Sequence, residues 1–265
     1  MSDRVLELEG VHNFRDYGGY AVAGGGRVRR GLLWRSGQHH GASDADLERI
    51  AALGLAHVFD LRSGKERETH PCRRPAGFGA RVCFVDDAAH AQAPHVAAAA
   101  AAAAASPRKH DAASARAGMV RNYSTMPFRP ALIDMMRAQL AALAEGGGPS
   151  LVNCMAGKDR TGIAVMAIQA ALGVHRDDIM ADYLLTNSAG DVEARIAAGI
   201  QTILAITGQR DEAVMRVLMG VEEEYLATAL SAIDERHGSL EGYLREALGV
   251  DDTMTTALRA ALIED

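Results

Sequence analysis

The chain has 265 residues, of which 48% are hydrophobic and 23% are charged, and its formal net charge is −6. This composition is ordinary for a globular protein with a substantial core, and the negative charge argues against nucleic acid as a partner. Three scattered cysteines exclude a disulfide framework and offer no spacing typical of a structural zinc site, so we expect no bound metal. No segment is long enough to span a membrane, and the charged N-terminus has no apolar signal region, which predicts a cytoplasmic protein.

The first element along the chain is expected at residues 27–35, "RVRRGLLWR", as an edge strand or a hairpin. Its arginines, Arg27, Arg29, Arg30 and Arg35, either form a basic patch or belong to a solvated edge strand. The sequence leaves both readings open.

A helix follows in "GASDADLERIAALGL", because Ser43 can cap its start, Asp46 stands three residues later, and Gly54 can end it. Two short apolar runs then predict strands. Residues 56–61, "AHVFDL", fit a buried parallel strand, and residues 80–87, "ARVCFVDD", predict another.

Residues 88–118 interrupt this order with nine consecutive alanines, Ala97 to Ala105. Alanine favours helix, but the run has no apolar stripe with which to dock on a core. We expect an insertion here, which is either a helical lid over a site or a tolerated low-complexity surface loop.

Periodic apolar residues resume in a helix over 127–148, followed by a brief strand at 150–154 and a buried helix at 160–173. From Arg176 to the C-terminus, repeated caps and leucines predict helices only. Strands that alternate with helices indicate one α/β domain over residues 1–265, with a mostly parallel central sheet flanked by helices and a helical C-terminal region.

The stretch "NCMAGKDRTG" lies where the strand at 150–154 meets the next helix. Ligands bind at this edge of open α/β sheets, and the amides of a helix N-terminus attract anions. Cys154 and Arg160 enclose five residues, whose amides can converge on one phosphate while Arg160 grips two of its oxygens. The same amides favour a thiolate at Cys154, which indicates phosphoryl transfer through a cysteinyl-phosphate.

Other interpretations of this loop fit less well. The Walker A motif needs Ser or Thr after its lysine, but Asp159 follows Lys158. A lone cysteine is most often a buried structural residue. Here the glycine, lysine and arginine at fixed spacing favour the catalytic reading.

With these residues in place, "CMAGKDRTG" resembles the HCxxGKDRTG signature of the atypical bacterial and fungal tyrosine phosphatases related to mycobacterial protein tyrosine phosphatase B. Further blocks resemble the family in the same order: "NFRDYGGY", "WRSGQ", "VFDLRSGKER" and "GSLEGYLREALGV". The resemblance implies the C-x5-R phosphatase fold and hydrolysis of phosphotyrosine without metal or cofactor. It also implies activity of some members on phosphoserine, phosphothreonine or phosphoinositides, so the expected partner is a phosphorylated protein or a phosphoinositide.

Carried over to this sequence, the resemblance makes Cys154 the nucleophile, Arg160 the phosphate clamp and Asp159 the general acid. Lys158 adds positive charge, a trait associated with polyanionic lipid substrates. Asn153 departs from the family pattern, since most members carry histidine there, and this puts the rate in question more than the activity. The residues expected around the phosphate are Met155, Ala156, Gly157, Lys158, Asp159 and Arg160.

The general acid has alternatives. Asp159 adjoins Arg160, which favours its charged form and is awkward for an acid. Asp86 and Asp87 follow a strand upstream of the cysteine, as the acid of ordinary dual-specificity phosphatases does. Asp60 also ends a strand, but we expect it to hold Arg62 or a turn.

Residues outside the loop have simpler expected roles. His39 and His40 are expected in a solvated loop, although substrate contact is open for both. We expect Asn13 and Arg15 to tie the N-terminal segment to the domain. Trp34 is expected in the core, while Cys72 and Cys83 are expected to be inert.

Two other functions compete with the phosphatase. Asn153 raises the alternative of a catalytically weak phosphate-binding pseudophosphatase, but the intact Cys154, Asp159 and Arg160 argue against it. A sulfurtransferase also uses a loop cysteine after a strand, yet nothing in its chemistry calls for "GKDRTG".

Overall fold

The computed structural model describes residues 3–85, 94, 96–97, 111–189, 191–194, 196–197, 200, 204 and 211–265. Its centre is a five-stranded sheet in the order β1-β3-β6-β4-β5, in which only β1 runs antiparallel to its neighbour. A two-stranded sheet pairs β2 with β7. The strands span Arg15–Asp16 (β1), Arg27–Val28 (β2), Leu33–Ser36 (β3), His57–Asp60 (β4), Arg81–Cys83 (β5), Ser150–Asn153 (β6) and Ile263–Glu264 (β7).

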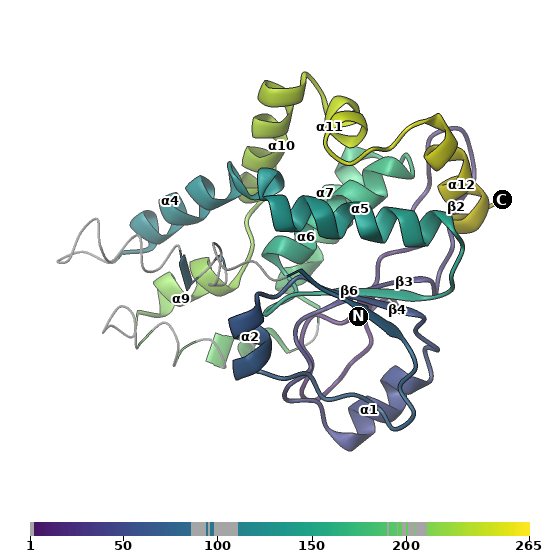
Figure 1. Ribbon diagram of the computed structural model, residues 1–265. Coiled ribbons are helices and arrows are strands. Elements are labelled where there is room, and N and C mark those ends of the chain that lie inside the picture. The colour runs from purple at the N-terminus through teal and green to yellow at the C-terminus, as the bar shows by residue number, and fades with distance from the viewer. Residues whose placement is uncertain are drawn as a thin grey trace.

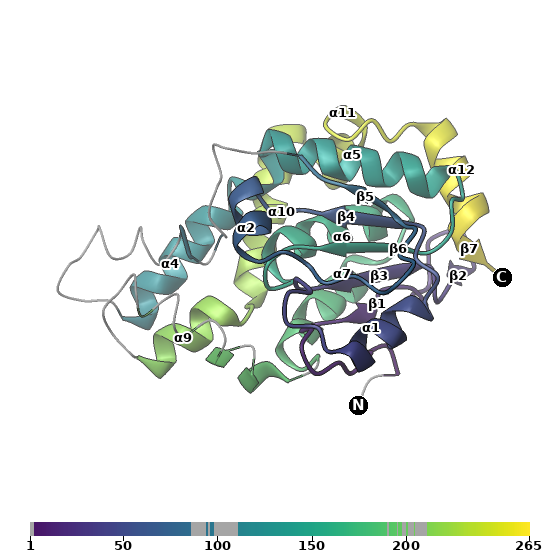
Figure 2. The ribbon, with the colours of Figure 1, turned by 60° about the horizontal axis from the view of Figure 1, so that its bottom comes forward.

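Helices cover both faces of this sheet (Figures 1 and 2). α1 and α2 lie on one side, and α5, α6, α7 and the C-terminal helices lie on the other. α4 packs against α9 and α10 at one end of the molecule. The helices span Asp44–Ala51 (α1), Gly64–Thr69 (α2), Ala112–Tyr123 (α4), Pro130–Ala144 (α5), Asp159–Ala171 (α6), Arg176–Leu184 (α7), Glu212–Met219 (α9), Glu223–His237 (α10), Leu240–Glu246 (α11) and Asp252–Leu262 (α12), with 3-10 turns at Met126–Phe128 and Leu185–Asn187.

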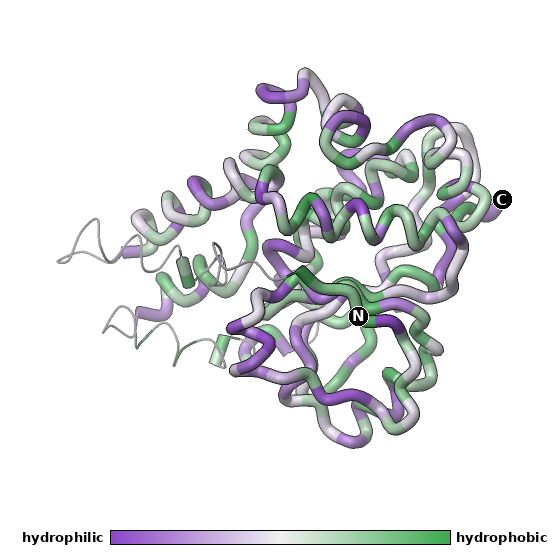
Figure 3. The backbone as a smooth tube through the Cα atoms, in the orientation of Figure 1, coloured by the Kyte–Doolittle hydropathy of each residue, from purple (hydrophilic) through white to green (hydrophobic). Residues whose placement is uncertain are grey.

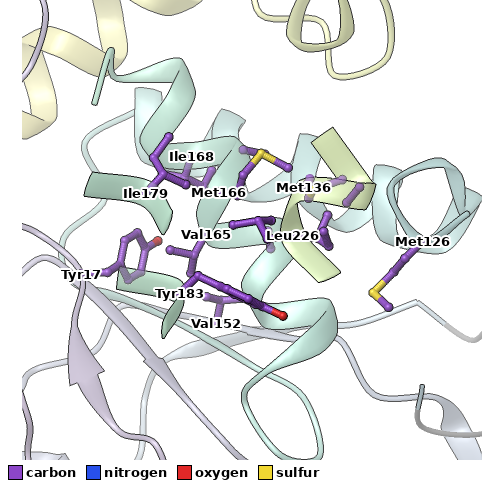
Figure 4. Close-up of a cluster of buried hydrophobic side chains, with 14 of the residues drawn as sticks. Tyr17, Met126, Met136, Val152, Val165, Met166, Ile168, Ile179, Tyr183 and Leu226 are labelled. Carbon is purple, nitrogen blue, oxygen red and sulfur yellow. The ribbon is translucent and has the colours of Figure 1, made fainter. Parts of the chain in front are cut away.

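Alternation along the central strands divides the core in two. Val58 and Leu151 belong to a small cluster under α1, whereas Phe59 and Val152 belong to a large cluster under the other helices. Because successive strand residues point to opposite faces, one apolar strand supplies both layers. Figure 3 shows the strands as a largely hydrophobic central band, and Figure 4 shows part of the large cluster, including Val152.

The α/β fold with a mostly parallel sheet is confirmed, as are the strands at 56–61, 80–87 and 150–154 and the helices that begin after residues 43, 129 and 158. Ser43 and Asp46 form the expected capping box of α1. Residues 176–265 are mainly helical, but they also contain β7, which the sequence did not predict.

Residues 27–35 differ from the prediction. They contain two strands, β2 and β3, and β3 lies between β1 and β6 rather than at an edge. Arg27, Arg29 and Arg30 are exposed, but Arg35 is fully buried. A continuous basic stripe is therefore wrong, because β3 turns Arg35 into the protein.

The predicted insertion, residues 88–118, falls largely outside the described residues. Its last part, residues 112–118, forms the first turns of α4, where Ala115 and Gly118 are buried. Trp34, expected in the core, packs half-buried against the small cluster. No helix within the described ranges is both long and apolar enough to cross a membrane.

Candidate active site

The C-x5-R loop, residues 154–160, joins the carboxyl end of β6 to the first turn of α6. β6 is buried over its whole length between its parallel neighbours β3 and β4, so the loop lies at the edge where open α/β sheets bind ligands. Cys154 is 2% exposed at the end of the strand. The structure thus places Cys154 and Arg160 together between a strand end and a helix N-terminus, which is a favourable position for an anion.

Gly157 is the turning point of the loop. Its φ is +67°, and a Cβ atom there would lie 2.4 Å from the carbonyl carbon of Ser36 and 2.5 Å from the amide nitrogen of Gly37. Backbone that close cannot move aside, and the left-handed φ disfavours any other residue. The glycine of the motif is therefore required by the packing of the loop against the end of β3.

Two side chains hold the carbonyl oxygen of Gly157. Asn13 Nδ2 donates to it at 2.6 Å and an Arg35 terminal nitrogen donates at 3.1 Å. Asn13 has a φ of +61°, and its own Oδ1 accepts a hydrogen bond from Arg15. Because carbonyl and following N–H point in opposite directions across a trans peptide, this clamp turns the amide of Lys158 away from Asn13 and Arg35.

Behind this clamp lies what we call the rear cluster: Arg15, Arg35 and Asp182. Arg35 donates to Asp182 Oδ2 at 2.8 Å, and Arg15 donates to Asp182 Oδ1 at 3.4 Å and to its carbonyl oxygen at 2.8 Å. All three residues are fully buried. Burial, and then the neighbouring Arg35, lower the pKa of Arg15 to about 9.

For the carboxylate of Asp182, the neighbouring charges affect the pKa more than burial does. Burial alone would raise its pKa, but Arg15 and Arg35 outweigh burial and hold the pKa below its ordinary value. With two guanidinium groups and one carboxylate, the rear cluster has an excess positive charge beneath the loop. A fixed charge in a water-excluded site favours an anion bound above it. Asn13 and Arg15, expected to tie the N-terminal segment to the domain, therefore also fix the loop.

Arg160 is oriented by what we call the front pair, Arg160 and Glu66. Two guanidinium nitrogens donate to the two Glu66 oxygens at 2.7 and 2.8 Å, and one of them also donates to the carbonyl of Leu61 at 2.9 Å. Arg160 Nε is buried and has no hydrogen-bond partner in the part of the chain that the structure describes. The forked contact fixes the plane of the guanidinium, and the Nε–H remains as a donor for an anion.

Glu66 was not among the residues predicted for the site. It belongs to α2, where Ser63 and Glu66 form a capping box. Burial alone would raise the pKa of Glu66, but Arg160 lowers it below its ordinary value, so the carboxylate stays charged. The Ser-x-x-Glu spacing in "SGKE" is the sequence signal that could have located this helix.

Lys158 and Asp159 contact each other inside the protein. Lys158 Nζ lies 2.7 Å from Asp159 Oδ1, and the hydroxyl of Tyr123 donates to the same oxygen at 2.8 Å. Lys158 is fully buried and Asp159 is 1% exposed. The charge of Lys158 is thus balanced next to the loop, and its contribution to polyanionic substrates stays a prediction.

Asn153, at the position where histidine was expected, links two strand ends. Its amide donates to Asp60 Oδ1 at 3.2 Å. Asp60 in turn accepts two hydrogen bonds from the guanidinium of Arg62, at 2.8 and 2.7 Å. This contact favours the expected role of Asp60 in holding Arg62 over a role as general acid.

The segment after β3 supports the loop from another side. The backbone N–H of Gln38 donates to the carbonyl oxygen of Met155 at 3.0 Å, and Ser36 Oγ lies 3.0 Å from His39 Nε2. His39 is 1% exposed, so the expectation of a solvated His39 is wrong, whereas His40 is exposed as expected. Burial lowers the pKa of His39 to about 3.

A cavity lies beside Arg160. The carboxyl end of β4, the start of α5 and Val85 surround it, and its lining residues include Arg62, Arg129 and Met135 but not Cys154. Of the other candidates, Asp86 and Asp87 lie outside the described residues. Cys72 and Cys83 are both free thiols.

Comparison with known proteins identifies the family of this chain. A model of the tyrosine phosphatase family matches residues 6–264. The triple specificity protein phosphatase PtpB of Mycobacterium tuberculosis is 34% identical over 281 residues, which cover 98% of this chain and 99% of that protein. A candidate tyrosine-protein phosphatase of Cupriavidus necator is 39% identical over 250 residues, which cover 93% of this chain and 85% of that protein. The chain, with its C-x5-R loop held between a buried strand and a helix N-terminus, therefore belongs to the tyrosine phosphatase family.

Proposed function

We propose that this phosphatase hydrolyses phosphotyrosine in proteins through a cysteinyl-phosphate intermediate, with Cys154 as nucleophile, Arg160 as phosphate clamp and Asp159 as general acid. The observation that carries the proposal is the state of Arg160, which lies on the same loop as Cys154. Glu66 fixes the guanidinium of Arg160, and the buried Nε of Arg160 has no hydrogen-bond partner in the described part of the chain.

In the first step the thiolate of Cys154 attacks phosphorus, and an S–P bond forms as the P–O bond to the tyrosine breaks. Asp159 gives its proton to the departing phenolate oxygen. In the second step a water molecule attacks the phosphorus, returns a proton to Asp159, and the S–P bond breaks to release inorganic phosphate and the thiolate. Amides of the loop and Arg160 stabilise the charge on the phosphoryl oxygens in both steps.

The test is hydrolysis of p-nitrophenyl phosphate and of a phosphotyrosine peptide, with EDTA present, by wild type and Cys154→Ser. We expect turnover by wild type and none by the variant. Cys83→Ser is the matched control, because Cys83 is a half-buried thiol on β5, outside the loop. Turnover by Cys154→Ser would contradict the mechanism.

A second candidate function is a catalytically weak phosphate-binding pseudophosphatase, which the amide of Asn153 in place of histidine favours. In that case wild type would bind phosphate with very slow turnover. Asn153→His distinguishes the two, since a large rise in the rate of this variant would identify Asn153 as the cause of the weak activity.

We extend the proposal to phosphoserine, phosphothreonine and phosphoinositide substrates as slower alternatives. The name of the mycobacterial relative, a triple specificity phosphatase, supports testing them. Initial rates on phosphoserine peptides and on vesicles that contain a phosphoinositide, compared with a phosphotyrosine peptide, would rank the three classes. Faster release of phosphate from the vesicles would overturn the preference for phosphotyrosine.

A further inference from the structure

Three hydroxyl and carboxylate oxygens form a chain that ends on Asp159. The hydroxyl of Tyr183 donates to the hydroxyl of Tyr123 at 2.8 Å, and Tyr123 donates to Asp159 Oδ1 at 2.8 Å. The three residues come from three different helices, α7, α4 and α6. The position of the Asp159 side chain therefore depends on how these helices pack together.

Both phenols are enclosed by the large apolar cluster. Tyr123 is fully buried and Tyr183 is 2% exposed, and Figure 4 shows Tyr183 among apolar side chains near Val165 and Val152. Burial raises the pKa of both phenols well above the ordinary value, so each remains a hydrogen-bond donor at any working pH. A buried hydroxyl that lacks a hydrogen-bond partner costs free energy, and these two hydrogen bonds give both hydroxyls a partner.

The signature motif itself makes room for this chain. Gly162, the last residue of "GKDRTG", is packed so closely that a Cβ atom would lie 3.0 Å from two ring carbons of Tyr183. The glycine thus lets the ring of Tyr183 approach the first turns of α6, immediately after the loop.

Asp159 Oδ1 accepts from two donors, Tyr123 and Lys158. An oxygen that accepts two hydrogen bonds, one from a cation, is a poor place for a proton. A proton on the acid form of Asp159 therefore resides on Oδ2. Fixing one oxygen in this way also fixes the rotamer of the carboxyl group.

We infer that Tyr123 and Tyr183 are positioning residues for the general acid: Tyr123 holds Oδ1 of Asp159, Tyr183 holds Tyr123, and the transferred proton is thereby kept on Oδ2. This inference rests on the proposed function, in which Asp159 protonates the leaving phenolate. Neither tyrosine gives up its own proton, since both are buried and stay protonated.

The experiment measures kcat/KM for aryl phosphates whose leaving groups range from p-nitrophenol to phenol. A good leaving group needs little protonation, whereas a poor one depends on the acid. For Tyr123→Phe we expect a loss of about tenfold or more with phenyl phosphate, the size of one hydrogen bond to a charged group, and a loss of less than about threefold with p-nitrophenyl phosphate. Tyr183→Phe should show the same pattern with a smaller loss.

The matched control is Tyr243→Phe. Tyr243 lies on α11 and is equally buried. Its hydroxyl donates to the carbonyl oxygen of Pro127 at 2.7 Å. Tyr243→Phe should change kcat/KM for neither substrate.

A pH profile with phenyl phosphate gives a second readout. The basic limb of the Tyr123→Phe profile should move to higher pH, because loss of the Tyr123 donor disfavours the carboxylate form of Asp159. A merely structural role of Tyr123 would lower kcat/KM equally for all substrates and leave the basic limb at the same pH.

A double variant separates this inference from the proposed function. Asp159→Asn should itself steepen the dependence of kcat/KM on the leaving group. Adding Tyr123→Phe to this variant should change that dependence no further. An additive effect, or equal losses on all substrates, would overturn the positioning role while Asp159 stays the acid. If Asp159→Asn alone leaves the dependence unchanged, the assignment of the acid fails, and the inference fails with it. If Tyr123→Phe does not fold, judged by near-UV circular dichroism, Tyr183→Phe decides in the same cycle.

Discussion

The front pair and the rear cluster both bury arginine beside a carboxylate, but they differ in net charge and in position, since only the front pair includes a residue of the C-x5-R loop. Arg160 and Glu66 are one cation and one anion, and the Nε of Arg160 has no partner within the described chain. Arg15, Arg35 and Asp182 are two cations and one anion, and the terminal nitrogens of both arginines donate within the protein. The Nε of Arg35 also has no hydrogen-bond partner within the described chain, but Arg35 lies on β3 and Arg160 lies on the loop that carries Cys154.

The difference separates two tasks that one anion site requires. The front pair offers a directed hydrogen bond at a fixed angle, while the rear cluster fixes the backbone at Gly157 and adds a positive field with no direction of its own. We therefore expect changes at the front to reduce turnover more than stability, and changes at the rear to do the reverse.

The largest expected effect is on stability, from Asp182→Asn. The change leaves two buried guanidinium groups without a counter-charge, and breaking a buried ion pair from one side costs about 3–5 kcal/mol. Urea unfolding measures the loss. Asp234→Asn, which breaks a partly exposed pair with Arg176, should change the unfolding free energy little. Equal losses in the two variants would remove the rear cluster as a special source of stability.

The next effect is on turnover, from Arg160→Lys. Lysine keeps the charge but loses the planar fork and the Nε–H, so kcat/KM on p-nitrophenyl phosphate should fall about 10²–10³-fold. Arg116→Lys is the matched control, because Arg116 makes a similar forked contact with Glu222 at 2.6 and 2.8 Å near the surface. A loss of less than about threefold for Arg160→Lys would show that charge alone suffices.

A smaller effect concerns stability against pH, through His39. Its pKa is about 3 in the folded protein and about 6.5 when unfolded, so the unfolded chain binds one more proton between these values. The contribution of neutral His39 to the free energy of unfolding is complete above pH ~6.5. It falls as the pH decreases, by about 2 kcal/mol at pH ~5. His39→Gln should flatten this part of the curve in urea unfolding at several pH values.

His40→Gln is the control for His39, because His40 is an exposed neighbour on the same segment. It should leave the slope between pH ~6.5 and pH ~5 unchanged. An equal change of slope in both variants would mean that the burial of His39 is not the cause.

The smallest effect distinguishes two substitutions at Asn13. Both Asn13→Gly and Asn13→Ala remove the hydrogen bond to Gly157, which should lower kcat/KM about threefold to tenfold in each. Only alanine is strained at the φ of +61°, so Asn13→Ala should be less stable than Asn13→Gly by about 1 kcal/mol. Thermal unfolding and steady-state rates on the same samples test both parts, and unequal rates would show that backbone strain itself affects the loop.

Much of the fold could be predicted because its signals are local. The capping box of Ser43 and Asp46 marks a helix start, and short apolar runs mark buried strands, whatever lies around them. The C-x5-R loop could be placed at a strand end for the same reason. Residues 27–35 were misjudged because arginine in a short strand usually faces solvent, and only the partner Asp182, far along the chain, makes burial of Arg35 possible.

The sequence by itself determined the loop: a cysteine and an arginine at fixed spacing, a glycine between them, and a helix to follow. Those features depend on residues within ten positions of one another, and local backbone chemistry decides them. Only the tertiary structure decided which groups support the loop. Glu66, Tyr123 and the adjacent pair Asp182 and Tyr183 come from three separate helices, α2, α4 and α7, and nothing in their local sequence states that they meet. Their charges and hydroxyls are paired because burial leaves each polar group only the partners that packing brings to it.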